Sequence, residues 1–525
     1  MSEPAKTPQT NGFDTGRGRQ SSARGFRLKG RFEWPFMSLF ALLLAVATAR
    51  HELWNDEMQA WLIARDNHSL ASLFHSLRYE GHPSLWYLVL SFPSHLSANP
   101  FSMQIINYLF SITTCWLILS ARKITLATRV MVVFSFFLFY NFGVIARSYM
   151  LAMLLLIAAA RCLMGERQHR RLAIVLLALA INTHILAIPI AGAVAIWAFC
   201  FDALGSWKDT KNLFRKKEFI VAFAVLVASV AVAYLTVRPA PDLTVPLWPE
   251  EQHSLIYNFF LSEGRAWTAF FPATTSQLPH GLQALLGLGG QFSIFASVGS
   301  MILLVLVAVA LRTKQARFLF LLGSVLELVA MAATVKDPPL RYFGLIFTNF
   351  LIALLVDAYA VGARTCSIQL PRAASSATVL VILGVQTLAA MFAWVSVTVR
   401  PFSEAKEVAQ WLKQAGLQNN PLVVDGPDTT AVLGYMGRSS AYRTSCPCTG
   451  SYAVFRAGFD LDRGTTASDL RSARGGSDLP AILVHSGGRL DPAEVQRLGL
   501  IELHSFSPRP TDSPGMYSVY EQNIQ

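Results

Sequence analysis

The sequence predicts an α-helical polytopic membrane protein of about eleven transmembrane helices, followed by a small soluble α/β domain. Hydrophobic residues make up 53% of the 525 residues and charged residues only 14%, whereas a soluble chain averages about 25% charged residues. Apolar stretches long enough to span a bilayer recur between Phe36 and Trp394. After Arg400 the composition becomes polar, with short apolar runs.

The N-terminal segment is expected to stay in the cytoplasm. Residues 1–32 contain Ser, Gly and Arg in a pattern typical of a disordered chain. This polar lead is long, and no small-residue cleavage site follows the first apolar run, so we expect residues 34–49 to remain as the first span. The basic residues before this span favour a cytoplasmic N-terminus.

The remaining spans follow from the same hydropathy rule. They are expected near residues 100–121, 126–141, 148–164, 171–184, 185–204, 219–237, 291–311, 317–335, 342–361 and 376–397. Every loop that this order places in the cytoplasm carries Lys or Arg, as the positive-inside rule requires. The net charge of +12 therefore needs no nucleic-acid partner, because none of the basic clusters lies on a soluble domain.

The same order places several loops and the C-terminal tail on the external face. The external loops are 50–99, 141–147, 238–290 and 336–341. The first of them, 50–99, is expected to form amphipathic helices. The tail, 399–525, begins with the helix-like SEAKEVAQWLKQAG and continues with short β-type runs such as PLVVDG and PAILVHSG. This order predicts a small external α/β domain.

The external tail carries no GxGxxG motif, P-loop or full metal-ligand set. Its two cysteines, Cys446 and Cys448, lie in the sequence SCPCTG. A disulfide between them suits an oxidising compartment, although it would be strained, and unpaired thiols are the alternative. A metal site would need more ligands nearby.

Polar residues in the first external loop have two interpretations. The loop contains the acidic pair Asp56-Glu57 and the sequence Glu80-Gly81-His82-Pro83. In a helix, Asp56 would share a face with Glu52 and Gln59. The first interpretation is a reaction site, and the second is local structure: acidic residues favour helix starts, and proline favours the first helical turn. Both stay open at this point.

Other external segments add basic and aromatic residues. These are Arg147 with Tyr149, His184, and Lys336 with Arg341 and Tyr342. An external arginine departs from the positive-inside trend and is expected to pair with an anion. Arginine binds phosphate in a bidentate manner, so these segments form a candidate phosphate clamp. A buried interface histidine is an equally good explanation of His184.

Carboxylates and arginines on one membrane face suit a single reaction type. In the transfer of a sugar from a membrane lipid phosphate to a hydroxyl acceptor, a carboxylate is needed as general base. Positive charge is needed for the leaving phosphate. Phosphate leaves without protonation, so no general acid is required. One base on the face opposite the leaving group gives inversion at the anomeric carbon.

At these residues the chain resembles the polyprenyl-phosphate-dependent membrane glycosyltransferases of the GT-C fold. This superfamily includes the protein O-mannosyltransferases and the lipid A aminoarabinose transferases. Its acidic pair is matched by Asp56-Glu57, and its His-Pro-Pro-Leu-Tyr-Tyr stretch by residues 82–87, HPSLWY. Its Arg-x-Tyr and later Arg-Tyr elements are matched at 147–149 and 341–342. The resemblance covers residues 35–360, with serine at position 84 in place of the second proline.

The resemblance implies a GT-C-like catalytic domain over 33–398 in a bacterial inner membrane, with the C-terminal domain in the periplasm. It implies a polyprenyl-phosphate-linked sugar as donor and a lipid or glycan as acceptor. Asp56 would be the catalytic base, and Glu57 would position acceptor or donor. The implied donor-phosphate residues are Arg147, Arg341, Tyr149, Tyr342 and Lys336, and the implied cavity residues are Glu80, His82 and His184. The candidate cofactor is a divalent metal ion, with Glu80 and His82 as candidate ligands.

Two other classes of protein fit parts of the pattern. A flippase or transporter of lipid-linked saccharides would place charges near the middle of the membrane and often contains internal repeats. Here the charges gather at one interface, and no repeat is evident. An external polysaccharide polymerase or ligase would use a large late loop, for which residues 238–290, with Arg265, are available.

Overall fold

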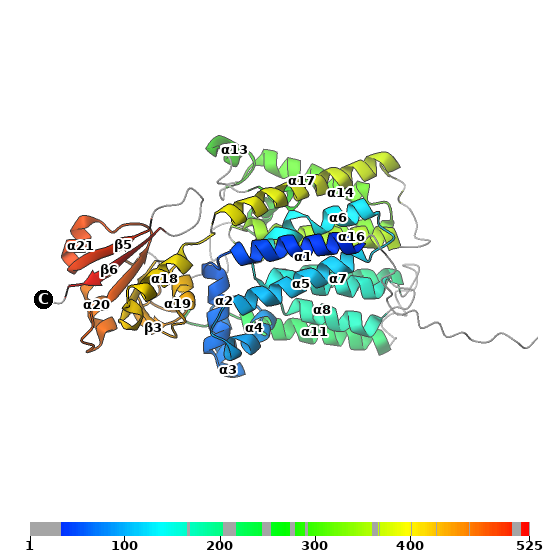
Figure 1. The fold of residues 1–525 in the computed structure, drawn as a ribbon. Helices are drawn as coiled ribbons and strands as arrows, with labels where there is room; N and C mark the ends of the chain where they lie inside the picture. The colour runs from blue at the N-terminus through cyan, green and yellow to red at the C-terminus, as the bar shows by residue number, and fades with distance from the viewer. Residues whose placement is uncertain are drawn as a thin grey trace, which may run out of the picture.

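The protein consists of a bundle of long helices with a sheet-containing region beyond one end (Figure 1). In this computed structural model the described residues are 33–164, 169–202, 217–243, 254–273, 279–288, 292–335, 337–359, 366, 368–400, 402–426, 428–460, 463–506 and 516–523. The predicted cytoplasmic segment 1–32 lies outside these residues.

Most of the bundle consists of helices that run roughly parallel or antiparallel to one another (Figure 1). They are α1 (Glu33–Arg50), α5 (Phe101–Leu119), α6 (Leu126–Val133), α7 (Ser148–Leu163), α8 (Arg170–Ile181), α9 (Ala187–Trp197), α11 (Lys217–Val237), α14 (Ile294–Ala310), α15 (Lys314–Thr334), α16 (Leu340–Tyr359) and α17 (Arg372–Val399). Shorter elements are η1 (Phe136–Asn141), η2 (Ala198–Asp202), α12 (Leu255–Glu263), η4 (Ala266–Ala269) and α13 (His280–Leu285).

The chain is an integral membrane protein. Within the described residues, six helices (α1, α5, α11, α15, α16 and α17) are long and apolar enough to cross a membrane, and three shorter apolar helices accompany them. The outer helices expose apolar side chains, as a lipid-facing surface requires: Leu388, Met391, Phe392 and Val399 of α17 are between 61% and 73% exposed. Each predicted span overlaps a helix, but the count of eleven stays a prediction.

Three helices of residues 50–99 lie across one end of the bundle (Figure 1). They are α2 (Asn55–Asp66), α3 (Leu70–Leu77) and α4 (Leu85–Leu96). Helix α3 begins where the hydroxyl of Ser69 accepts a hydrogen bond from the backbone amide of Ser72. The buried side of α2 includes Trp61 and Leu62, which join the main hydrophobic core. This packing fixes the polar start of α2 against the ends of the bundle helices.

The C-terminal region, residues 402–523, contains a mixed six-stranded sheet. Its strands are β1 (Leu422–Asp425), β2 (Ala441–Arg443), β3 (Cys448–Gly450), β4 (Ile482–Ser486), β5 (Leu500–Ser505) and β6 (Tyr517–Gln522), in the order β3-β2-β1-β4-β6-β5. Strand β1 pairs in parallel with β2 and β4 and is buried along its whole length, as a central parallel strand should be. The helical elements are α18 (Ala405–Gln414), η6 (Leu417–Asn419), α19 (Thr429–Met436), α20 (Ala467–Arg474) and α21 (Pro492–Leu498).

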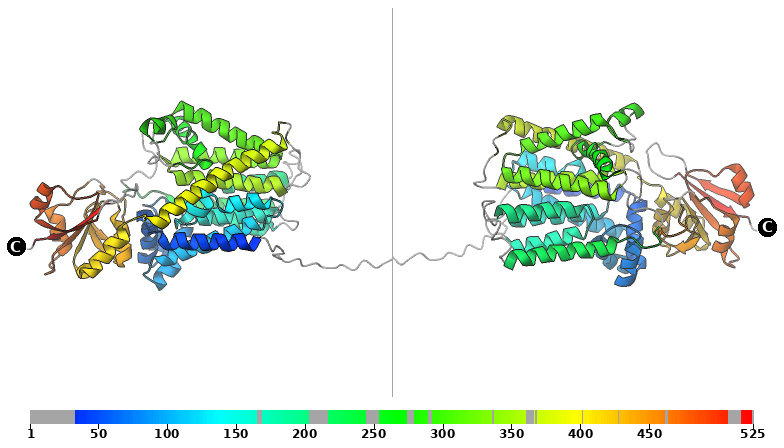
Figure 2. Two further views of the ribbon diagram at one scale, coloured as in Figure 1. Left: turned by 45° about the horizontal axis from the view of Figure 1, so that its top comes forward. Right: turned by 180° about the vertical axis from the view of Figure 1, so that it is seen from behind.

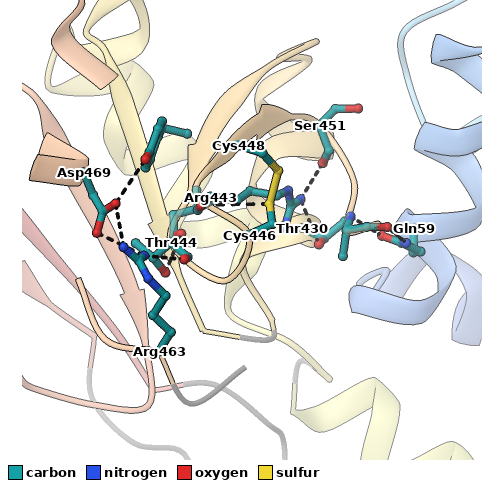
Figure 3. Close-up of a disulfide and its surroundings, with 12 residues drawn as sticks. Gln59, Thr430, Arg443, Thr444, Cys446, Cys448, Ser451, Arg463 and Asp469 are labelled. Atoms are coloured by element: carbon teal, nitrogen blue, oxygen red, sulfur yellow. Dashed lines mark hydrogen bonds and ion pairs between the residues drawn. A yellow bond between two sulfur atoms is a disulfide. The ribbon is translucent and has the colours of Figure 1, made fainter. Parts of the chain in front are cut away.

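The C-terminal region is docked on the segment that contains α2, and the views of Figure 2 agree on this arrangement. Helix α19 packs against α2. The backbone amide of Leu53 donates to the Tyr435 hydroxyl at 2.6 Å, and Arg65 Nη2 donates to the Arg438 carbonyl at 2.7 Å. Cys446 and Cys448 form a disulfide where β2 turns into β3 (Figure 3), which decides the alternative that the sequence left open.

Candidate active site

The residues singled out from the sequence meet where α2 to α4 cover the end of the bundle. Asp56 lies in the first turn of α2, and His82 precedes α4. Arg147 is the N-cap residue of α7, and Arg341 lies in the first turn of α16. His184 lies between α8 and α9. Since each residue stands at a helix start or in a short connection, its side chain reaches the shared space at this end.

Asp56 is held by two arginines. Its Oδ2 atom contacts Arg147 Nη1 and lies 3.0 Å from Arg341 Nη2. The side chains of Arg147, Arg341 and Asp56 are 11%, 27% and 31% exposed. Burial would raise the pKa of Asp56, but the charges of Arg147 and Arg341 outweigh burial and hold this pKa below its usual value. Asp56 is therefore ionised at neutral pH.

His82 is neutral in this setting. Burial and the neighbouring charge of Arg147 lower the pKa of His82 to about 3. Arg147 Nη2 lies 3.3 Å from His82 Nε2. A guanidinium can only donate, so Nε2 is the acceptor and the ring proton is on Nδ1. This histidine supports Arg147 without adding a second positive charge.

His184 is buried within a cluster of aromatic rings. Its ring centre lies 4.6 Å from that of Tyr149, 5.5 Å from that of Tyr342 and 5.2 Å from that of His82. Its Nδ1 atom accepts the backbone amide of Leu186 at 3.1 Å, so the proton is on Nε2. Among the described residues, Nε2 has no hydrogen-bond partner. It is therefore a buried donor beside Tyr149 and Tyr342.

Glu57 is directed away from the arginines and joins α2 to the bundle. Its Oε2 atom lies 2.8 Å from His51 Nε2 and accepts the backbone amide of Trp54. Its Oε1 atom accepts the backbone amide of Ala146 at 2.6 Å, next to Arg147. The carboxyl group is fully buried. This geometry suits positioning of the segment that carries Asp56 and Arg147. The resemblance implied that Glu57 positions acceptor or donor, and that role stays a prediction.

Glu80 provides a second carboxyl group with the opposite electrostatics. Its Oε1 atom accepts a hydrogen bond from Gln59 Nε2 at 2.6 Å. Burial raises the pKa of Glu80 to about 8, although Gln59 and Arg147 lower it in part. Glu80 is therefore mostly protonated at neutral pH, while Asp56 is ionised. Two carboxyl groups with pKa values pushed apart are typical of a site that handles protons.

The group formed by Asp56, Glu80, His82, Arg147 and Arg341 carries a net positive charge. Among these five residues, the two guanidinium groups outweigh the carboxylate of Asp56, while His82 and Glu80 are largely neutral at pH 7. Arg341 also lies over the rings of Trp54 and Tyr342, with its central carbon 5.7 Å and 5.8 Å from their centres. These rings limit the positions of the guanidinium. The arrangement suits an anion with several oxygen acceptors, such as phosphate.

Sequence reasoning identified most but not all of these residues. Lys336 lies outside the described residues. The contribution of Trp54 was missed, although it stands two residues before Asp56. The Gln59–Glu80 hydrogen bond was also missed, although Gln59 shares a helix face with Asp56. Among the described residues, no group of three or more His, Cys, Asp or Glu side chains is arranged to hold a metal ion, so the pair Glu80 and His82 lacks a third ligand.

Comparisons with known proteins do not assign a family. No protein-family model matches the chain, and no curated protein matches it. A solved structure that matches is the crystal structure of ArnT from Cupriavidus metallidurans in the apo state, with a TM-score of 0.48 and 13% sequence identity. The match covers 94% of this chain and 99% of the ArnT chain. A likeness at this level indicates no activity, which has to come from the residues of the site.

Proposed function

We propose that the protein is a membrane glycosyltransferase that moves a sugar from a polyprenyl-phosphate donor to an acceptor hydroxyl, with inversion. The observation that carries this proposal is the contact of Arg147 and Arg341 with one carboxylate oxygen of Asp56. The three residues are far apart in the sequence. Their meeting places a phosphate-binding pair beside a candidate base at the end of a membrane bundle.

The donor phosphate is proposed to bind between the two arginines. Both guanidinium groups present planar N–H donors, and one net positive charge is left after pairing with Asp56. His184 adds a buried N–H donor. The apolar outer surface of the bundle suits a substrate whose lipid tail stays in the bilayer while its phosphate reaches the site. Positive charge at this point stabilises the negative charge that develops on the leaving phosphate.

Asp56 is the proposed general base. As the acceptor hydroxyl attacks the anomeric carbon, its proton passes to Asp56. The new bond joins the acceptor oxygen to the anomeric carbon, and the bond to the phosphate oxygen breaks. The polyprenyl phosphate leaves with the bonding electron pair, so proton, atoms and charge are balanced. Attack from the side opposite the phosphate inverts the anomeric centre.

Donor binding also activates the base. In the free protein, Arg147 and Arg341 hold the pKa of Asp56 low, which makes it a weak proton acceptor. A phosphate that takes over these guanidinium groups removes that stabilisation. Burial then raises the pKa of Asp56, and the carboxylate becomes a stronger base only when the donor is in place. The donor thus prepares the group that receives the proton of the acceptor.

The alternative classes fit the geometry less well. A transporter would use ionisable residues near the middle of the membrane, whereas Asp56 and both arginines lie at one end of the helices. A polymerase that depends on the loop 238–290 would need Arg265 for its substrate. The guanidinium of Arg265 instead contacts Asp337 and donates to the Gly287 carbonyl at 2.7 Å. The proposed reaction takes place on the external, periplasmic face of a bacterial inner membrane, where the positive-inside rule places this end.

The experiment is a donor screen. Purified protein in nanodiscs is incubated with a series of polyprenyl-phosphate sugars and a lipid or glycan extract, and products are identified by mass spectrometry. We expect one donor to give a glycosylated acceptor and free polyprenyl phosphate in equal amounts. Asp56→Asn is the matched inactive control. Movement of the lipid across a vesicle membrane without any product would instead identify a flippase.

A further inference from the structure

Among the described residues, one link between the C-terminal region and the candidate site runs through the side chain of Gln59 on α2. Gln59 Nε2 donates to Glu80 Oε1 at 2.6 Å and to the Ala453 carbonyl at 2.7 Å. Gln59 Oε1 accepts the backbone amide of Ala453 at 3.0 Å. The amide therefore binds the backbone of Ala453 in both directions and still has a donor for Glu80. Gln59 is 7% exposed as a residue, so water competes little for these bonds.

Residues 451–453, which bind Gln59, also make hydrogen bonds to other residues at the end of α2 and on α3. The Ser451 hydroxyl contacts Asp66, and the Tyr452 hydroxyl lies 3.1 Å from Asn67 Nδ2 and 3.0 Å from Ser76 Oγ. Residues 451–453 directly follow β3 and the disulfide, and Figure 3 shows Ser451 there and Gln59 on the neighbouring helix. We call residues 451–453 the docking strip. Within this strip, only Ala453 is bonded to Gln59, whose side chain also binds Glu80.

We propose that Gln59 is a positioning residue through which the C-terminal region holds the Glu80 carboxyl group in the site for the acceptor. This inference rests on the proposed glycosyl transfer. Glu80 does not carry out the base step, which belongs to Asp56. Its mostly protonated carboxyl group offers a hydrogen-bond donor and an acceptor to a sugar or lipid hydroxyl beside Asp56. A docked C-terminal region therefore completes the acceptor side, while the arginines form the donor side.

The test compares Gln59→Leu with Tyr452→Phe. Gln59→Leu keeps a similar volume and removes all three hydrogen bonds. Tyr452→Phe removes two hydrogen bonds of the same docking strip and touches neither Glu80 nor Asp56. We expect Gln59→Leu to raise the acceptor KM by about tenfold or more, as loss of a buried hydrogen bond at a binding group does. The donor KM and kcat should change much less, and Tyr452→Phe should leave the acceptor KM near that of the wild type.

A second readout does not depend on activity. The carboxyl C=O infrared band that disappears in Glu80→Gln reports the protonation of Glu80 in the resting protein. The charged groups facing Glu80 are Arg147 and Asp56, with Tyr87 nearby on α4. Gln59 stabilises the ionised form by donating to it, so Gln59→Leu should shift this titration to higher pH, and Tyr452→Phe should not.

The outcomes separate the two proposals. An unchanged infrared titration in Gln59→Leu, or equal effects of Gln59→Leu and Tyr452→Phe on both readouts, would overturn the positioning role. A normal acceptor KM in Gln59→Leu would also overturn the acceptor assignment. If the wild type transfers no sugar from any polyprenyl-phosphate donor, the proposed function and the acceptor assignment fail together. The infrared titration then still decides whether Gln59 sets the state of Glu80.

Discussion

Replacing Asp56 by asparagine separates the base step from donor binding. Asparagine has the shape of aspartate but accepts no proton at neutral pH. A positioned general base typically contributes about 10²- to 10⁴-fold in rate, so we expect kcat to fall by that factor. The protein should still insert and fold, because asparagine can accept a hydrogen bond from either guanidinium group.

The same substitution should leave donor binding intact or make it tighter. In the free protein, the carboxylate competes with the donor phosphate for Arg147 and Arg341. A charge pair at about 4 Å is worth roughly 4 kcal/mol at an effective dielectric constant of about 20. The partial exposure of Asp56 reduces this to roughly 1 kcal/mol. Removing the carboxylate should therefore lower the donor Kd by up to about fivefold.

The assay measures kcat by mass spectrometry of the product and the donor Kd by equilibrium binding in nanodiscs. Asp357→Asn is the control, since Asp357 lies near the far end of α16 and accepts the backbone amides of Arg312 and Thr313. It should leave kcat within about twofold of the wild type. A kcat for Asp56→Asn within tenfold of the wild type would refute the base assignment. Weaker donor binding would indicate that Asp56 mainly orders the arginines.

Other substitutions test the remaining parts of the site. Arg341→Ala should weaken donor binding by about 10- to 100-fold, as loss of a charge-assisted hydrogen bond does, and Arg341→Lys should recover only part of it; unchanged affinity in binding assays would contradict the clamp. The pH profile of kcat/KM reports the lowered pKa of Asp56 in the free protein, whereas the profile of kcat reports the pKa of Asp56 in the donor complex. The acid limb of kcat/KM should therefore lie at lower pH than the acid limb of kcat. Coincident acid limbs would contradict activation of Asp56 by the donor. Glu57→Gln should destabilise the protein by about 1–3 kcal/mol in thermal unfolding, because the new NH₂ group would face either the buried backbone amide of Ala146 or His51. Unchanged stability would mean that Glu57 does not join α2 to the bundle.

The sequence by itself determined the membrane class and most of the candidate site. Hydropathy depends on local composition, so it identified the apolar segments without knowledge of their contacts. Arg147 and Asp56 could also be recognised as site candidates from the sequence, because a charged side chain in an apolar setting needs a partner. The C-terminal helix and short apolar runs predicted helix α18 and several of the strands in the same way.

Only the tertiary structure decided which charges meet and what each carboxyl group does. Asp56 and Glu57 are adjacent in the sequence, but α2 directs one toward two arginines and the other toward a backbone amide. The Gln59 link to Ala453 joins residues 394 positions apart and carries no local pattern. Electrostatic roles follow from distance and burial, which depend on how separate helices pack. For that reason, the ionised state of Asp56 and the mostly protonated state of Glu80 belong to the fold and not to either residue type.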